Sequence, residues 1–136
     1  MELYKDKNQP VEKRVEDLLS RMTLEEKVAQ LCGDLPMELA VDGMPTTERL
    51  KEKFPHGHGR LTQYSTMGLG DPMRIARLTN VIQKYFVEET RLGIPVVLQS
   101  GNLCGYPAMG GTLFPSQINA SCTWDPELVE EMSQII

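Results

Sequence analysis

Apolar residues recur at three- and four-residue steps near the start of the chain, and this pattern predicts two amphipathic helices. The first begins at Pro10, where a missing N–H costs nothing, and its apolar face carries Val11, Val15, Leu18, Leu19 and Met22. The second follows a capping box at residues 23–26, and Gly33 is expected to end it in a left-handed turn. Both helices are interpreted as packing elements without catalytic groups. Residues 1–9 are polar and are predicted to form a loose segment ahead of a domain over residues 10–136.

The rest of the chain alternates short strand-like and helical patterns. β-branched and apolar runs predict buried strands, and the three- and four-residue steps predict helices. The predicted elements are a short helix at 47–54, a strand near 59–64, a helix from 71 to 90, a strand at 94–98 and a helix at 125–136, with a loop at 67–70. Such alternation with short connections indicates an α/β fold with a parallel sheet.

The predicted elements do not add up to a closed domain. The last helix ends on Ile135 and Ile136 without a cap, and two strands cannot make a stable parallel sheet covered on both faces. We therefore expect the front part of a larger domain, truncated in a helix. Exposed strand edges and apolar helix faces are expected to make the chain fold poorly and associate when it stands alone.

Composition and charge exclude some classes of partner. The 136 residues carry a net charge of −5, which argues against nucleic-acid binding. No apolar run reaches the length of about 18 residues that a membrane span requires, and the N-terminus lacks the apolar core of a secretory signal. Three widely spaced cysteines favour a reducing compartment, and a cytoplasmic location is the simplest prediction. The oligomeric state is not predicted.

The loop that follows the strand at 94–98 is the candidate binding region, since α/β folds place ligands at the carboxyl ends of their strands. It contains no carboxylate between Gln99 and Ser121. Cys104 has no histidine nearby in sequence to activate it, so a partly buried structural thiol is favoured over a nucleophile. Tyr106 and Trp124 could stack on a sugar ring, although such residues more often anchor a core or a loop. Asp125 is interpreted as a helix N-cap.

Other candidates for chemistry have simpler interpretations. His56 and His58 lie in a glycine-rich stretch, but two histidines without a third ligand do not make a zinc site, and the stretch lacks a phosphate-loop ending. A glycine turn into a short strand is the favoured interpretation. The carboxylates lie mainly on predicted helix surfaces, where solvation explains them: Glu12, Glu16, Asp17, Glu25, Glu88, Glu89, Glu130 and Glu131.

Several segments together carry a family signature. Residues 14–31 read RVEDLLSRMTLEEKVAQL, residues 91–97 read RLGIPVV, and residues 110–115 read GGTLFP and are followed by TWDPELV at 123–129. In order and spacing these segments resemble the N-terminal domain of glycoside hydrolase family 3, the β-glucosidase and β-xylosidase family. The resemblance spans most of the chain except residues 34–70.

The resemblance implies a fold and an activity. The fold would be an incomplete (β/α)8 TIM-type barrel, with about the first two βα units preceded by N-terminal helices. A complete barrel takes roughly 250 residues. The activity would be retaining hydrolysis of terminal β-linked sugars by two carboxyl groups, in a full-length parent and without cofactor or metal. The family's catalytic residues lie downstream, so the chain is expected to hold none of them and to be inactive alone. The alternative is a non-catalytic carbohydrate-binding or remnant protein.

One departure from the family pattern concerns the candidate loop. Family members commonly carry an acid, two further residues and then His-Gly, and the acid grips sugar hydroxyls. Aligned on the shared glycine, Gly101 stands at the acid's place and Cys104 at the histidine's. Loss of that carboxylate is expected to weaken sugar binding, with Asn102 or Gln99 as a neutral replacement. The predicted substrate-binding residues are therefore Gln99, Gly101, Asn102 and Tyr106.

Overall fold

The computed structural model describes residues 2–35, 39, 43–63, 71–106 and 110–136. Its described part contains a three-stranded parallel sheet in the order β1 (Gly33–Asp34), β2 (Arg60–Thr62) and β3 (Val97–Gln99). Arg60 pairs with Gly33 on one side and with Val97 on the other. The predicted α/β class with a parallel sheet is confirmed. The structure does not show a barrel.

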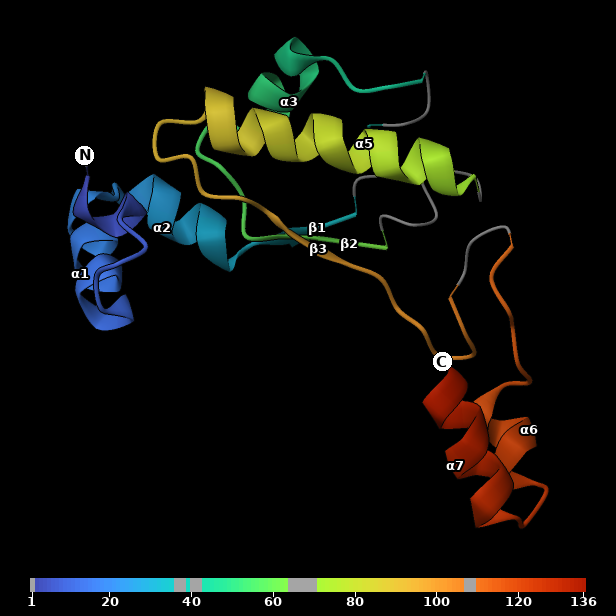
Figure 1. Ribbon diagram of the computed structural model, residues 1–136. Coiled ribbons are helices and arrows are strands. Elements are labelled where there is room, and N and C mark those ends of the chain that lie inside the picture. Colours follow the sequence, from blue (N-terminus) through green and yellow to red (C-terminus); the bar gives the residue numbers. More distant parts are fainter. Residues whose placement is uncertain (1, 36–38, 40–42, 64–70, 107–109) are drawn as a thin grey trace.

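The helices surround this sheet unevenly (Figure 1). Helix α5 lies along one side of the sheet with α3 beyond it, while α1 and α2 lie near the N-terminus. Predicted and observed helices agree closely, and α6 is an addition that the sequence pattern did not indicate. The bounds are η1 Leu3–Lys5, α1 Val11–Arg21, α2 Leu24–Leu31, α3 Thr47–Lys53, α5 Pro72–Lys84, the π-helical η3 Tyr85–Glu89, α6 Gln117–Ser121 and α7 Pro126–Ile135. None of the helices described is long and apolar enough to cross a membrane.

The core lies where α3 and α5 meet the sheet. Leu61 of β2 is fully buried, and it belongs to one cluster with Leu78 and Ile82 of α5 and Phe86 of η3. Removing such apolar surface from water stabilises the fold by about 1.5–3 kcal/mol per side chain. The buried Tyr85 hydroxyl donates to the Phe54 carbonyl at 2.9 Å, which joins the end of α5 to the end of α3.

The strand predicted at 94–98 begins later than expected, at Val97. Pro95 has no N–H to donate to a ladder, and the backbone of Val96 is bound elsewhere. The Gln83 amide donates to the Val96 carbonyl at 2.7 Å and accepts from the Val96 N–H at 3.2 Å. This pair of bonds docks α5 onto the chain entering β3, so pairing within the sheet starts one residue further on.

Gly33 does not end α2 in a left-handed turn, and that prediction is wrong. Cys32 caps the helix in an extended conformation, and Gly33 continues directly into β1. The N–H of Arg60 donates to the Cys32 carbonyl at 3.2 Å, so the chain is already pairing with β2 where the turn was expected. Tertiary pairing, rather than local glycine preference, decides this conformation.

Residues 1–9 were expected to form a loose segment, but Tyr4 within this segment is held in place. Its ring is buried, and its hydroxyl donates to the Leu92 carbonyl at 2.8 Å. The backbone of Tyr4 is held as well, since its N–H donates to Asp17 at 3.0 Å and its carbonyl accepts from the Arg14 guanidinium at 2.9 Å. The N-terminal turn is therefore fixed on both α1 and the segment before β3.

The predicted capping box at the start of α2 is confirmed and carries a second function. The Thr23 hydroxyl accepts from the Glu26 N–H, and the Glu26 carboxylate accepts from the Thr23 N–H. Glu26 is buried, and its carboxylate also pairs with the Arg91 guanidinium, whose Nε donates at 2.9 Å. This hydrogen bond holds the pKa of Glu26 below its usual range. The cap thereby joins α2 to the turn that leads to β3.

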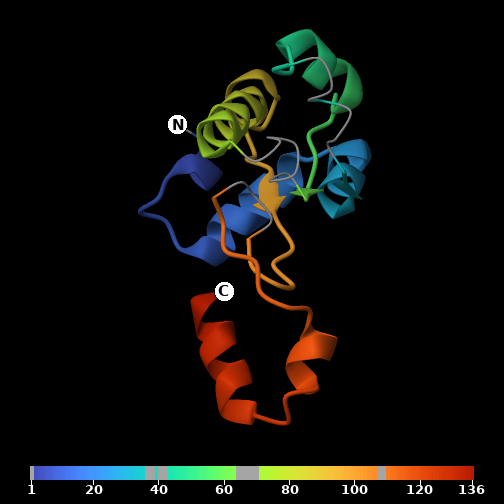
Figure 2. The same cartoon turned by 90° about the vertical axis from the view of Figure 1, so that its right-hand side faces the viewer.

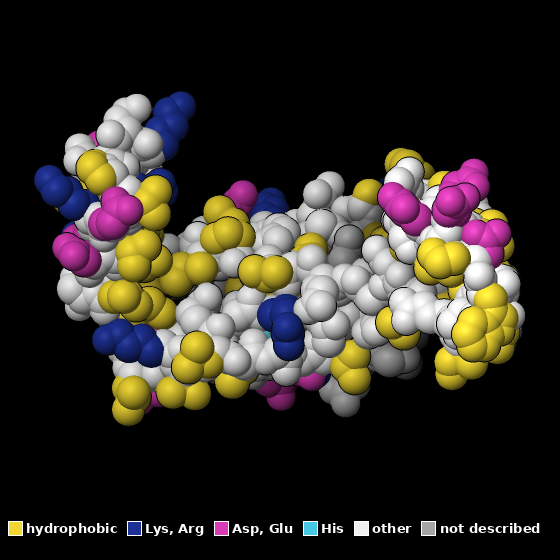
Figure 3. All heavy atoms as spheres, turned by 90° about the horizontal axis from the view of Figure 1, so that it is seen from below, with side chains coloured by type: hydrophobic (Ala, Val, Ile, Leu, Met, Phe, Trp, Pro, Cys, Tyr) yellow, Lys and Arg dark blue, Asp and Glu magenta, His cyan; other side chains and the backbone are white. Residues whose placement is uncertain are grey.

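Helices α6 and α7 lie apart from the sheet and its helices (Figures 1 and 2). Apolar side chains gather at both ends of one face, over the N-terminal helices and over α6 and α7 (Figure 3). The face of α1 that was expected to pack is largely exposed, as are Leu24, Val28 and Leu31 on α2. Exposed apolar faces of this kind are surfaces at which proteins commonly bind other apolar surfaces.

Candidate functional site

The carboxyl ends of the three strands form one polar edge. β1 ends at Asp34, Gln63 follows β2, and Ser100 and Gly101 follow β3. Parallel strands present these ends on the same side of a sheet, and ligands of α/β folds bind there. We call Asp34, Gln63, Ser100 and Gly101 the carboxyl edge. It is where the sequence predicted a binding loop, although Asp34 and Gln63 were not among the predicted residues.

The structure places the four predicted substrate-binding residues along this loop without bringing them into one pocket. Gln99 ends β3, pairs with Thr62 and is exposed. Asn102 borders a hollow of about 470 Å³ that is shared with α6 and α7. The half-buried Tyr106 borders a separate hollow of about 310 Å³ on the surface of α5. Gly101 follows Ser100 in the loop after β3, and its predicted role in substrate binding stays a prediction.

Gly101 has a specific neighbour. A side chain at this position would place its Cβ 3.1 Å from Nε2 of Gln63, closer than an ordinary van der Waals contact. Gln63 has a φ of 58°, in the left-handed region that non-glycine residues rarely adopt. A side chain at position 101 would therefore crowd the Gln63 amide, which would have to shift by a few tenths of an ångström. No signal in the sequence indicates the left-handed backbone of Gln63, because glutamine is not a residue that typically adopts this conformation.

Among the four described residues of the carboxyl edge, Asp34 is the one with a carboxylate side chain. Its Oδ1 accepts from the Leu35 N–H at 2.7 Å, and its Oδ2 lies 3.2 Å from the Lys53 ammonium. A strand of two residues, Gly33–Asp34, is too short to give a periodic pattern, so sequence analysis missed the position. A retaining glycosidase needs two carboxyl groups about 5 Å apart, and the described part of the edge shows no such pair.

The glycine-rich stretch around His58 has a structural explanation. Gly57 adopts a φ of 80°, and a Cβ on Gly59 would lie 2.0 Å from the Gln30 carbonyl oxygen. The His58 ring packs on Phe54 at 4.8 Å between centroids. Across the residues that the structure describes, no three His, Cys, Asp or Glu side chains lie together as a metal ion requires. The favoured interpretation, a glycine turn into a short strand, agrees with β2 at Arg60–Thr62.

The loop beyond the carboxyl edge folds back on itself. The Phe114 N–H donates to the Cys104 carbonyl, and Gly105 bridges to Leu113. Gly105 has a φ of 113°, and a Cβ there would lie 2.0 Å from the Thr112 carbonyl oxygen, so this crossing requires glycine. Cys104 is half-buried with a free thiol, as predicted for a structural cysteine.

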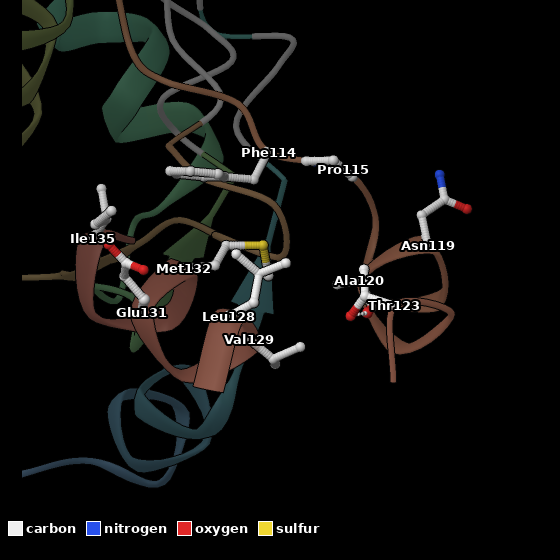
Figure 4. A pocket seen from close by; sticks show the side chains of 10 residues that line it. All are labelled: Phe114, Pro115, Asn119, Ala120, Thr123, Leu128, Val129, Glu131, Met132 and Ile135. Carbon is white, nitrogen blue, oxygen red and sulfur yellow. Dashed lines mark hydrogen bonds between the residues drawn. The ribbon is translucent and has the colours of Figure 1, made fainter. Parts of the chain in front are cut away.

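A third hollow, of about 570 Å³, lies between α6 and α7. Figure 4 shows Leu128 and Met132 of α7 beneath Phe114, with Ala120 and Thr123 across the space. Its lining is mainly apolar and supplies few groups for chemistry. Trp124 is 91% exposed, so it is not the core anchor that was one of its two interpretations. Asp125 is the predicted N-cap, since its Oδ1 accepts from the Leu128 N–H at 3.0 Å.

Comparison with known proteins finds relatives named as β-glucosidases and β-xylosidases. The chain is 29% identical over 98% of its length to a protein of Formosa agariphila named as a β-xylosidase, and 30% identical to β-glucosidase C of Emericella nidulans. It is 28% identical to a periplasmic β-glucosidase/β-xylosidase of Dickeya chrysanthemi. The chain spans 18%, 22% and 22% of these proteins, about a fifth of each. No protein-family model matches it.

These similarities define a class for the chain. Along almost its whole length it is a homologue of proteins named β-glucosidase and β-xylosidase, and the resemblance predicted from its motifs is confirmed. The particular family indicated by those motifs is glycoside hydrolase family 3, and the chain corresponds to only part of each relative's length.

Proposed function

We propose that this chain is part of a glycoside hydrolase that cleaves terminal β-linked sugars, and that the chain supplies scaffold and one wall of the sugar site. The observation that carries the proposal is similarity over 98% of the chain to proteins named β-xylosidase and β-glucosidase. The carboxyl edge supports it by its position, because ligands of α/β folds bind at the carboxyl ends of the strands. The substrate is a β-linked glycoside or oligosaccharide.

The reaction is proposed for a longer protein that carries this chain. Retaining hydrolysis uses one carboxylate as nucleophile and one carboxylic acid as general acid and then base. The Asp34 carboxylate, already bound to Lys53 and to the Leu35 N–H, is one acid without a second beside it in the described residues. We therefore propose that the chain alone is inactive and that both catalytic groups come from elsewhere in the longer protein.

Hydrolysis of a panel of aryl β-glycosides tests this proposal, with the matching α-glycosides as controls. The longer protein should release the aryl alcohol from a β-glucoside or β-xyloside, while the 136-residue chain should release none. Measurable hydrolysis by the chain itself would contradict the assignment of its catalytic carboxylates to another part of the protein.

The alternative is a non-catalytic carbohydrate-binding or remnant protein. The departure of the loop from the family pattern, with Gly101 and Cys104 at positions commonly held by an acid and a histidine, favours it. Inactivity of the longer protein on every β-glycoside, together with retained binding of the same sugars, would support this alternative.

The cellular compartment of the protein is a further part of the proposed function. The three cysteines of the described chain are free thiols, and their spacing led to the prediction of a cytoplasmic location. The relative from Dickeya chrysanthemi is named as periplasmic, so the cytoplasmic location stays a prediction. Fractionation of cells that express the longer protein tests it directly.

A further inference from the structure

The hollow that Tyr106 borders has the dimensions of a small-molecule site. Its volume is about 310 Å³, at the lower end of the range of about 300–1,000 Å³ that is usual for ligand pockets. A space of this size holds a ligand of about one sugar ring. We call it the Tyr106 hollow, and its described lining consists of Pro72, Ile75, Ala76, Thr79, Asn80 and Tyr106.

The Tyr106 hollow is built from the chain that leaves the carboxyl ends of two neighbouring strands. Helix α5 follows β2 and Tyr106 follows β3, and these two strands pair in parallel. Figure 1 shows that α5 begins at the end of the sheet to which the strands run. Ligands of α/β folds bind at this end of the sheet.

The polar side chains of the Tyr106 hollow have no partner in the described part of the chain. Tyr106 and Thr79 are half-buried and Asn80 is exposed, and no hydrogen bond or ring contact engages their side chains there. A buried tyrosine hydroxyl usually finds a hydrogen-bond partner, and each of these three side chains can both donate and accept. The hollow therefore presents three polar groups that a bound molecule can satisfy.

The lining of the Tyr106 hollow favours a neutral ligand that contains a ring. None of the described lining residues is charged, so none of them compensates the charge of an acidic or basic ligand. The Tyr106 ring offers a flat apolar face, and Thr79 and Asn80 add a hydroxyl and an amide. A sugar matches this combination, because a pyranose carries C–H groups on its faces and hydroxyls around its edge.

We propose that the Tyr106 hollow binds a sugar ring of the β-linked substrate beyond the unit whose bond is cleaved. The Tyr106 ring stacks on this pyranose, and Asn80 and Thr79 hydrogen-bond its hydroxyls. Bond cleavage needs two carboxyl groups and the described lining contains none, so this ring is bound away from the reacting bond. The inference rests on the proposed function and deepens it, since it assigns β-linked oligosaccharides as better substrates than single glycosides.

The test compares methyl β-glycosides of glucose and xylose with the β-linked di- and trisaccharides of the same sugars, all hydrolysed by the longer protein. The wild type should have a lower KM for the oligosaccharides. Tyr106→Ala and Asn80→Ala should raise this KM about three- to tenfold, the equivalent of about one lost contact. They should leave kcat and the KM for the methyl glycosides within about twofold, whereas a merely structural role would change both KM values together.

Ala76→Trp tests the space of the hollow rather than its contacts. Ala76 is exposed on α5 and lines the hollow, so an indole there fills the space without removing a buried group. This variant should raise the KM for oligosaccharides and leave Tm unchanged. Asn119→Ala is the matched control, because it changes an exposed asparagine that lines the hollow between α6 and α7, and it should leave every KM unchanged.

The proposed function and this inference fail in distinguishable ways. A longer protein that hydrolyses none of these β-glycosides overturns the proposed function, and this inference with it. An active wild-type protein whose Tyr106, Asn80 and Ala76 variants keep the wild-type KM for oligosaccharides overturns this inference alone. So does an equal rise of KM for the methyl glycosides and the oligosaccharides, and the proposed function then stands without the Tyr106 hollow.

Discussion

At the scale of single residues, burial of polar side chains sets the response of this protein to pH. His58 is half-buried, and its Nε2 is buried with no hydrogen-bond partner in the described structure. Burial lowers the pKa of His58 below its usual value, while the nearby Asp34 carboxylate acts in the opposite direction and Lys53 adds to the lowering. The folded protein therefore favours the neutral imidazole.

We predict that the longer protein loses stability as the pH falls below about 6.5, the ordinary pKa of histidine. The unfolded chain then binds a proton that folded His58 resists, so unfolding becomes easier until the folded pKa is passed. Tm measured at pH 7.5 and pH 5.5 should differ less in His58→Gln than in the wild type. His56→Gln, which changes an exposed histidine, is the control and should keep the wild-type difference.

The lowered pKa of Glu26 leads to a second prediction, a loss of stability at more acidic pH. Its pKa is lowered, chiefly by the hydrogen bond from Arg91, so its stabilising contribution is present above about pH 4.5 and is lost as the pH falls through the folded value. Glu26→Ala should reduce stability by about 1–2 kcal/mol, from the lost cap and the partly exposed ion pair. Urea unfolding at pH 7 measures this, and Glu25→Ala on the exposed face of α2 is the matched control. Equal effects of the two substitutions would contradict it.

At the scale of elements, helices were predictable from the sequence and strands were less so. Thr23 and Asp125 cap their helices as predicted, and Asp71 caps the helix predicted from residue 71, because a cap and an amphipathic stripe are local signals. The strands have two or three residues each, and their limits depend on partners far away in sequence. The bonds between Gln83 and Val96 that delay β3 could not be inferred from either segment alone.

The candidate site was likewise predictable from the sequence only in part. Its position, after a strand that follows a helix, was predictable from the alternation of elements. The closeness of the Gln63 amide to position 101 was not, because it depends on the register of two strands. The predicted loop at residues 67–70 lies outside the described residues.

The joint between α2 and β2 yields a prediction at this scale. The Gly59 N–H donates to the Ala29 carbonyl at 2.9 Å, and a Cβ on Gly59 would lie 2.0 Å from the Gln30 carbonyl oxygen. Gly59→Ala should therefore destabilise the longer protein by about 3 kcal/mol, because backbone has to move. Gly33→Ala is the control, since its Cβ would meet the flexible Arg60 side chain, which can shift. Thermal unfolding of both variants should show a large loss of Tm for Gly59→Ala alone.

At the scale of the whole molecule, apolar surface remains uncovered in the chain. Leu128 and Ile135 of α7 are 49% and 62% exposed and line the hollow between α6 and α7. Surfaces of this kind bind other apolar surfaces. The sequence-based expectation that the chain associates when it stands alone is supported by this exposure and remains to be measured.

We predict that the 136-residue chain sediments as a concentration-dependent mixture of oligomers. Leu128→Glu combined with Ile135→Glu should shift it towards monomer, whereas Glu127→Gln on the same helix should not. Sharp, cooperative melting of a monomeric wild-type chain would show that the expectation is wrong.

The hydrogen bond from Tyr4 to Leu92 has a kinetic consequence. It closes a loop of 88 positions, and the bond from Arg91 to Glu26 closes one of 65. Every strand pair in the described sheet is parallel, so each also joins segments separated by a helix or more. Contacts between distant segments are slow to form, because the chain loses entropy before it gains them. Refolding should therefore form the helices early and the sheet late, and the N-terminal turn should dock after the turn before β3 is in place.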